Sequence, residues 1–218
     1  MLSVVIPALN AAATLGATLK SVEGADEVVV VDGGSADGTV AVAERSGARV
    51  VMAPRGRGGQ LAAGVEGARG EWLLLLHADT RLGEGWMLVS PQGGWRGEER
   101  AYYFRLVLDC DDPRARRLER LVAWRSRVLG LPYGDQGLLI HRDLLRSVGG
   151  VRALPLMEDV DLVRRLGRRR LAAADVAAVT SAAKWVRDGW YRRSARNLVC
   201  LGLYFLRVPP GVIARMYG

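Results

Sequence analysis

The sequence is short of cysteine and of long apolar runs, and each shortage excludes a class of protein. Two cysteines, Cys110 and Cys200, in 218 residues make no disulfide framework, and their spacing is not that of a metal site. The expected compartment is therefore the reducing cytoplasm. The apolar run at residues 198–206 is far below the roughly 20 residues that span a bilayer. No transmembrane helix is therefore expected. Because the amino terminus has no basic region, a signal peptide is not expected either.

Lysine is also scarce, because Lys20 and Lys184 are the only two among 31 basic residues. The net charge of +8 is therefore carried by arginine, which suits bidentate contacts with phosphate and carboxylate groups. Nucleic acid, anionic lipid and a phosphorylated small molecule are all possible partners, and the base composition of the gene is an equally good explanation. Nucleic acid is not expected as a partner, because no recognition motif accompanies the charge.

Half of the residues are hydrophobic, and the length suits one domain with a substantial core. The first eighty residues alternate apolar strands with helical patterns. Strands are predicted at residues 2–6, 28–31, 49–52 and 72–76, and helices at 11–22, 38–46 and 59–68. This alternation is typical of an α/β fold with a mostly parallel sheet flanked by helices.

The second part of the chain is less regular. Strands are predicted at residues 101–108 and 137–141, and helices at 113–129, 142–149, 158–166 and 189–207. The apolar residues of the 113–129 helix are expected on one face, and the Pro209-Pro210 pair is expected to end the last helix. Neither a repeat nor a linker is present, so a single domain with a nucleotide-binding-like first half is predicted.

Acidic residues stand at the ends of two predicted strands. Asp32 follows the second strand and precedes a glycine-rich turn, which could admit a ligand closely or could simply be a turn capped by the aspartate. A dinucleotide fingerprint is excluded here, because the acid precedes the glycines. His77 and Asp79 follow the fourth strand, two residues apart, so both could face one cation. The alternative is a hydrogen-bonded turn followed by a helix cap.

A third acidic group, Glu158, Asp159 and Asp161, begins a predicted helix. Acids there stabilise a helix through its dipole, and one of them could instead act as a general base.

Taken in order, these segments resemble glycosyltransferase family 2, the inverting enzymes of the GT-A fold. The segments are residues 3–10, 27–39, 56–64, 70–80 and 158–162, and the resemblance covers roughly residues 2–188. It is similar to a small bacterial stand-alone subgroup with His-Ala-Asp-Thr (residues 77–80) where most members carry D-x-D. Residues 131–137 and 180–185 also look like that subgroup.

The resemblance implies a role for each matching residue. Those implied to bind the nucleotide-sugar donor are Pro7, Ala8, Asn10, Asp32, Arg57, Gln60, His77 and Lys184. Asp79 is implied as the ligand of a divalent cation, Mn²⁺ or Mg²⁺, and His77 replaces the first acid of D-x-D as a ribose or metal contact. Asp159 is implied as the catalytic base, with Glu158 beside it. Gly134, Asp135, Gln136 and Trp185 are implied on the acceptor side.

The implied reaction is metal-assisted transfer of a sugar from a nucleoside diphosphate to an acceptor hydroxyl. Three parts are expected within one GT-A-like domain: a donor-binding half (about residues 1–85), an acceptor and catalytic half (about 86–188) and a helical end (about 189–218). Because His77 departs from D-x-D, a nucleotide-sugar-binding or scaffold protein with degraded catalysis is the alternative. A nucleotidyltransferase lacks support, since residues 7–10 form no glycine-rich loop.

Two basic helices complete the pattern. The arginines at 114, 116, 117, 120, 125 and 127 crowd one helix, and those at 187, 192, 193 and 196 precede the last apolar run. Such segments can lie on an anionic membrane at its inner face and reach a lipid-linked acceptor. The alternative is a core helix with solvated arginines. Neither the acceptor nor the oligomeric state follows from the sequence.

Overall fold

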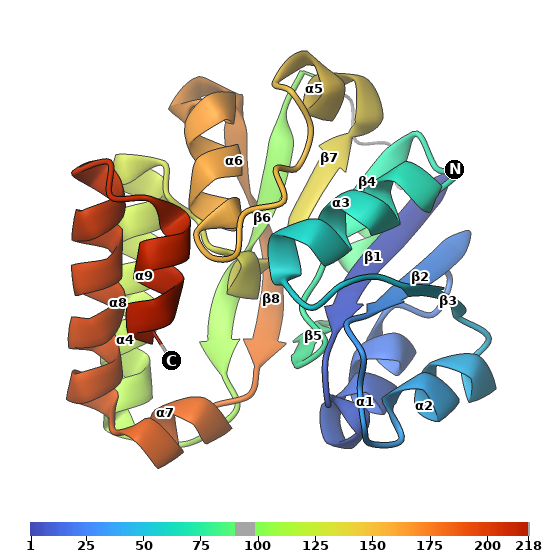
Figure 1. Cartoon of the computed structure of the whole chain (residues 1–218), viewed down its shortest axis with the longest axis horizontal. Coiled ribbons are helices and arrows are strands. Elements are labelled where there is room, and N and C mark those ends of the chain that lie inside the picture. The colour runs from blue at the N-terminus through green and yellow to red at the C-terminus, as the bar shows by residue number, and fades with distance from the viewer. Residues whose placement is uncertain (90–98, 218) are drawn as a thin grey trace.

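The computed structural model describes residues 1–89 and 99–217, which build one eight-stranded sheet with helices on both faces (Figure 1). The strands are β1 (Leu2–Ala8), β2 (Glu27–Asp32), β3 (Arg49–Met52), β4 (Trp72–Leu75), β5 (Thr80–Leu82), β6 (Ala101–Leu108), β7 (Leu138–His141) and β8 (Leu171–Thr180). The helices are α1 (Ala12–Ser21), α2 (Thr39–Arg45), α3 (Arg57–Gly67), α4 (Pro113–Trp124), α5 (Arg142–Ser147), α6 (Glu158–Leu166), α7 (Ala183–Asp188), α8 (Trp190–Phe205) and α9 (Pro210–Tyr217). Shorter helical turns are η1 (Trp86–Val89), η3 (Arg125–Leu129), η4 (Gly134–Gln136) and η5 (Arg168–Arg170).

The sheet order is β3-β2-β1-β4-β7-β6-β8-β5. The pairs among β1 to β4 are parallel, as is β6 with β8, whereas β7 runs antiparallel to both of its neighbours and β5 runs antiparallel to β8. The predicted α/β class with a mostly parallel sheet is confirmed. The carboxyl ends of the parallel strands meet at one edge, where ligands bind in open α/β sheets.

The core has two layers because neighbouring residues of each strand face opposite sides of the sheet. Val4 and Ile6 of β1 pack under α1 and α2, and Val5 packs under α3. The strands are apolar on both faces, and the apolar runs in the sequence are explained by this double burial.

Pro7 lies inside β1, although the sequence predicts a strand that stops before it. The amide of Leu76 donates to the carbonyl of Val5, so Val5 and, two residues later, Pro7 direct their backbone groups toward β4. Pairing with β4 ends at Val5. The missing N–H of Pro7 therefore removes no bond from the sheet.

The second half differs from the prediction in three places. The longest strand, β8, was not predicted, because its alanine-rich sequence has little β propensity. The predicted helix at 113–129 turns into a wider helical turn at Arg125. Of its apolar residues, Val122 is buried, whereas Leu121, Val128 and Leu129 are exposed. The helix predicted to be the last one is followed by α9, which Pro210 begins, as proline is well suited to a first helical turn.

Among residues 1–89 and 99–217, none of the helices combines the length and the apolar character needed to cross a membrane.

Candidate active site

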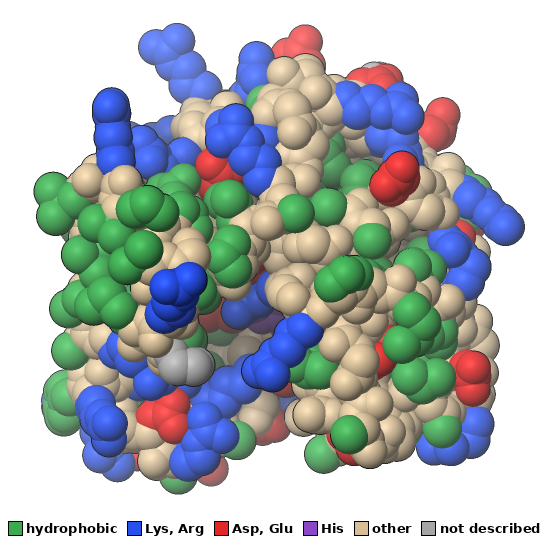
Figure 2. Space-filling model, in the orientation of Figure 1, with side chains coloured by type: hydrophobic (Ala, Val, Ile, Leu, Met, Phe, Trp, Pro, Cys, Tyr) green, Lys and Arg blue, Asp and Glu red, His purple; other side chains and the backbone are tan. Residues whose placement is uncertain are grey.

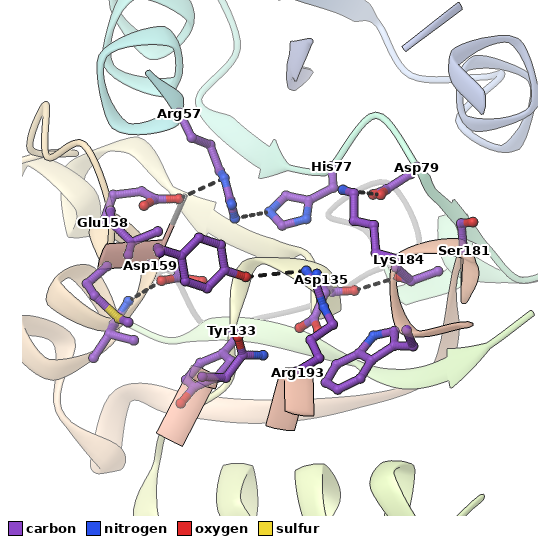
Figure 3. A pocket seen from close by; sticks show the side chains of 17 residues that line it. Arg57, His77, Asp79, Tyr133, Asp135, Glu158, Asp159, Ser181, Lys184 and Arg193 are labelled. Atoms are coloured by element: carbon purple, nitrogen blue, oxygen red, sulfur yellow. Dashed lines mark hydrogen bonds and ion pairs between the residues drawn. The ribbon is translucent and has the colours of Figure 1, made fainter. Parts of the chain in front are cut away.

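A pocket lies beside the carboxyl end of β4, where the segment after this strand meets α3, α6 and α7 (Figure 3). It encloses about 840 Å³ of empty space, counted out to its open mouth. His77 and Asp79 reach it from the segment after β4. Arg57 reaches it from the start of α3, and Glu158 with Asp159 from the start of α6.

Asp79 is held against a lysine that lies more than a hundred residues away in sequence. Thr80 pairs with Thr180 across β5 and β8, and the amide of Ser181 donates to the carbonyl of Asp79. The chain then turns into α7, which places Lys184 Nζ 2.9 Å from Asp79 Oδ2. Burial opposes ionisation of Asp79, but Lys184 and the other nearby cations outweigh it and lower its pKa. Asp79 is therefore a carboxylate facing the pocket.

Arg57 joins two sides of the pocket. Its Nε lies 3.2 Å from Glu158 Oε1, and its Nη1 lies 3.1 Å from Nε2 of His77. Burial, reinforced by the charge of Arg57, lowers the pKa of His77 to about 4. The imidazole is thus neutral at pH 7, and its Nε2 accepts a hydrogen bond from the guanidinium.

Glu158 is a buried acid with an unusual titration. Its side chain is 2% exposed. Burial raises its pKa to about 7, the neighbouring Asp159 adds to the rise, and Arg57 opposes it. Perturbed acids of this kind gather at functional sites.

Asp159 is fixed by backbone hydrogen bonds to both carboxylate oxygens. Gly134 N donates to Oδ2 at 2.8 Å, and Val160 N donates to Oδ1 at 2.7 Å. The carboxylate lines the pocket on the side opposite Asp79 and Lys184 (Figure 3). Asp135 lies between them, and burial raises the pKa of its carboxyl group. Its Oδ1 has no hydrogen-bond partner among the described residues.

A wider groove continues from this pocket along the end of β1. Its lining includes Pro7, Ala8, Asn10, Arg57, Gln60, His77, Asp79 and Lys184. The predicted donor-binding residues other than Asp32 are therefore brought to one surface. Trp185 and Asp135 line the pocket itself.

Three predicted site residues lie within hydrogen-bonded structure. Asp32 is fully buried, and its carboxylate accepts hydrogen bonds from the backbone amides of Gly34 and Ser35. Asp32 therefore caps the glycine-rich turn, which is one of the two alternatives that the sequence allows. The side-chain amide of Gln60 donates hydrogen bonds to the backbone carbonyls of Ala8 and Val31, near the ends of β1 and β2. Gln136 is buried, and its amide donates to the carbonyl of Phe104.

Sequence reasoning missed the residues that α8 and α9 add to the pocket. Arg193 and Asn197 of α8, and Tyr217 of α9, line the pocket. Arg193 pairs with Asp188 at 2.7 Å, and its Nη2 lies 3.3 Å from the hydroxyl of Tyr217. The sequence shows Arg193 within a run of basic residues, but no local pattern indicates that α8 folds back over the site.

The sheet order and the position of the pocket define a GT-A type α/β fold, and solved structures with this fold are similar to the chain. A mannosyltransferase from Pyrobaculum calidifontis, solved with GDP-mannose and Mn²⁺, matches with a TM-score of 0.67 at 20% identity, over 91% of this chain and 61% of that one. Glucosyl-3-phosphoglycerate synthase from Mycobacterium tuberculosis, solved with Mn²⁺, UDP and glucosyl-3-phosphoglycerate, matches with a TM-score of 0.56 at 26% identity, over 81% of this chain and 70% of that one.

At the level of sequence, residues 3–88 match the model of glycosyl transferase family 2. A lipopolysaccharide core biosynthesis glycosyltransferase from Rhizobium meliloti is 33% identical over 56% of this chain and 50% of its own length. A PGL/p-HBAD biosynthesis glycosyltransferase from Mycobacterium bovis is 40% identical over 38% of this chain and 37% of its own length. The matches thus span half or less of these curated relatives. The segment that matches the family 2 model carries β1 to β4, with His77 and Asp79.

Proposed function

We propose that the chain is an inverting glycosyltransferase that moves a sugar from a nucleoside diphosphate to an acceptor hydroxyl. The observation that carries the proposal is the meeting of Asp79, Lys184 and Asp159 in one pocket, at the end of a strand within the family 2 segment. The donors in the similar solved structures, UDP and GDP sugars, support a nucleotide-sugar donor here.

The groove along β1 suits the donor. Arg57 and Lys184 supply two cations beside the place where a diphosphate would lie, next to His77 and Asp79. Negative charge builds on the diphosphate as it leaves, and cations fixed in advance stabilise that charge.

A divalent cation fits the same place. Asp79 is ionised and His77 is neutral, which are the forms in which each side chain binds a metal. No three metal-binding side chains gather within residues 1–89 and 99–217, so donor oxygens and water would complete the coordination. When bound, the cation would neutralise diphosphate charge, and the Mn²⁺ in both similar structures supports it.

Asp159 is proposed as the general base. The acceptor oxygen attacks the anomeric carbon while the bond from that carbon to the diphosphate breaks, and the hydroxyl proton passes to Asp159. The hydrogen bonds from Gly134 and Val160 hold the carboxylate in position for this transfer. A single attack from the face opposite the leaving group inverts the anomeric centre and needs no nucleophile from the enzyme.

The first test is binding. Thermal melts of the protein with UDP, GDP and their sugars, with Mn²⁺ or Mg²⁺ and with a chelator, should give a Tm that rises with ligand concentration. The rise should be larger with the cation. If no nucleotide raises the Tm, the proposal is wrong.

The second test separates catalysis from binding. Asp159→Asn should remove metal-dependent donor hydrolysis and transfer, by about 100-fold or more, and leave the nucleotide-dependent Tm shift unchanged. Asp143→Asn, at an exposed acid of α5, is the control and should keep full activity. Loss of both binding and activity in Asp159→Asn would give the residue a structural role. A wild-type protein that binds donors without turnover would instead be a nucleotide-sugar-binding protein.

A further inference from the structure

The exposed apolar side chains of this protein gather on one layer of helices. Of the fourteen large hydrophobic side chains that are exposed in the described part of the chain, eleven belong to α4, η3, α8, α9 or the residue after α8. They are Leu121, Trp124, Val128, Leu129, Tyr191, Leu198, Val199, Phe205, Leu206, Val212 and Met216. We call this set the helical face. Figure 1 places α4, α8 and α9 together at one side of the molecule, and Figure 2 shows hydrophobic side chains gathered over α8 and α9.

Helix α8 divides cleanly into two sides. Tyr191, Leu198 and Phe205 are exposed and follow one another at intervals of seven residues, so they form one stripe along the helix. Cys200 is buried in the opposite side, and Arg193 on that side lines the active-site pocket. The stripe is therefore not needed to hold α8 on the protein, and its apolar groups remain in water.

The same layer carries the positive charge of the protein. Residues 113–129 hold six arginines and one acid, Glu119, and residues 189–217 hold five arginines and no acid. These two segments thus contain 11 of the 31 basic residues and 1 of the 23 acidic ones, which leaves the rest of the chain with more acid than base.

Several of these arginines remain available to a partner. Arg117, Arg120, Arg127, Arg192 and Arg215 are exposed, and none of them makes an ion pair with another described residue. A protein partner would bury such a face only by supplying many acids in matching positions. A bilayer with anionic headgroups supplies negative charge everywhere along its surface and admits the apolar stripe between its headgroups.

We propose that the helical face binds the surface of an anionic lipid bilayer. The stripe of α8 enters the headgroup region, and the exposed arginines without an ion pair, among them Arg117, Arg192 and Arg215, contact lipid phosphates. Because the opposite side of α8 lines the pocket, this helix, about 10–12 Å across with its side chains, then lies between the pocket and the bilayer. Figure 2 shows the hollow of the pocket beside the apolar side chains of this face.

Vesicle flotation of the intact protein tests this directly. The protein should float with vesicles that contain phosphatidylglycerol and not with pure phosphatidylcholine. Binding should weaken steeply as salt rises from about 0.1 M to about 1 M, because the screening length falls from about 10 Å to about 3 Å.

Two pairs of variants locate the binding surface. Leu198→Glu with Phe205→Glu, and separately Arg192→Glu with Arg215→Glu, should each reduce partitioning by about tenfold or more. All four side chains are exposed, so the Tm should stay at its wild-type value. Met52→Glu makes one such apolar-to-acid change at an exposed site on β3, and Arg45→Glu with Arg146→Glu makes two charge reversals at exposed sites on α2 and α5. Both should leave partitioning unchanged.

Three outcomes would overturn the proposal. The first is a wild-type protein that fails to float at any salt concentration, and the second is equal loss of binding in the helical-face variants and the controls. The third is a stable dimer in analytical ultracentrifugation that Leu198→Glu with Phe205→Glu converts to monomer, because the face would then belong to a second copy of this chain. None of these results depends on sugar transfer, so the membrane proposal can fail while the proposed activity stands.

Discussion

At the scale of single residues, the pocket depends on one arginine that serves two partners. Arg57 ion-pairs with the buried Glu158 and donates to the neutral His77, and burial has opposite consequences for the two. It raises the pKa of the acid and lowers the pKa of the imidazole, so both side chains tend toward their uncharged forms. Burial opposes the charge of the guanidinium, but Glu158, Asp159 and the other anionic groups around it raise the pKa of Arg57, so it stays charged.

Glu158 should make protein stability depend on pH. Its pKa is about 7 in the folded protein, against an ordinary value of 4.5, so the folded state holds the proton more tightly. This favourable contribution is complete below pH 4.5 and is lost as pH rises through 7. Relative to Glu158→Gln, the wild type should lose about 3 kcal/mol of unfolding free energy across that window. Urea unfolding of both proteins at several pH values measures the difference.

Because His77 is present in both proteins, its own titration cancels in the comparison. A difference between wild type and Glu158→Gln that stays constant from pH 4.5 to 7 would mean that Arg57 keeps Glu158 ionised throughout.

At the scale of elements, α3 is held close to the sheet by a glycine. A Cβ on Gly64 would lie 2.7 Å from Val31 Cγ2 and closer still to Val5 Cγ1, and both valines are fully buried. The closeness matters for function because α3 begins at Arg57 and includes Gln60, whose amide binds the ends of β1 and β2.

Gly64→Ala should therefore destabilise the protein by about 1–3 kcal/mol, since the two strands would have to move away from α3. Gly59→Ala is the matched control in the same helix. Its Cβ would meet no atom within 4 Å, so the better helix propensity of alanine should leave stability equal or slightly raised. Chemical unfolding of the two variants provides the comparison. If both variants changed the free energy of unfolding by the same amount, α3 would be able to move away from the sheet without loss of stability.

At the scale of the whole molecule, a single sheet joins the family 2 segment to the second half. β4 pairs with β1 on one side and with β7 on the other, and β6, β8 and β5 extend the sheet from there. The two halves thus share backbone hydrogen bonds as well as the pocket, and from this we propose that they form one domain.

We expect the two halves to unfold together. Tryptophans lie in both halves, at positions such as Trp72 and Trp190, so fluorescence reports on the whole molecule, and far-UV circular dichroism reports on the helices and strands. The two signals should give one transition with the same midpoint in urea. Separate midpoints would mean that the first four strands and their helices form an independent unit.

The sequence predicted the first half of the fold well because each signal there is local. The apolar runs at β2 and β4 predict strands from their local sequence alone. The acidic residues that follow these runs predict which edge of the sheet binds a ligand. The second half was harder to predict. Half of the residues of β8 are alanine, and its place beside β6 is stabilised by contacts with residues distant in sequence.

The sequence by itself determined the α/β class, the order of the motifs and the identity of the acids at the strand ends, because periodicity and turn chemistry act over a few residues. Only the tertiary structure decided which groups meet. Lys184 reaches Asp79 because β5 pairs with β8, Arg57 reaches Glu158 because α3 and α6 cover the same face, and the apolar stripe of α8 faces outward because its other side covers the pocket. These contacts join residues far apart in the chain, and their positions are fixed by packing and strand pairing, which no local pattern encodes.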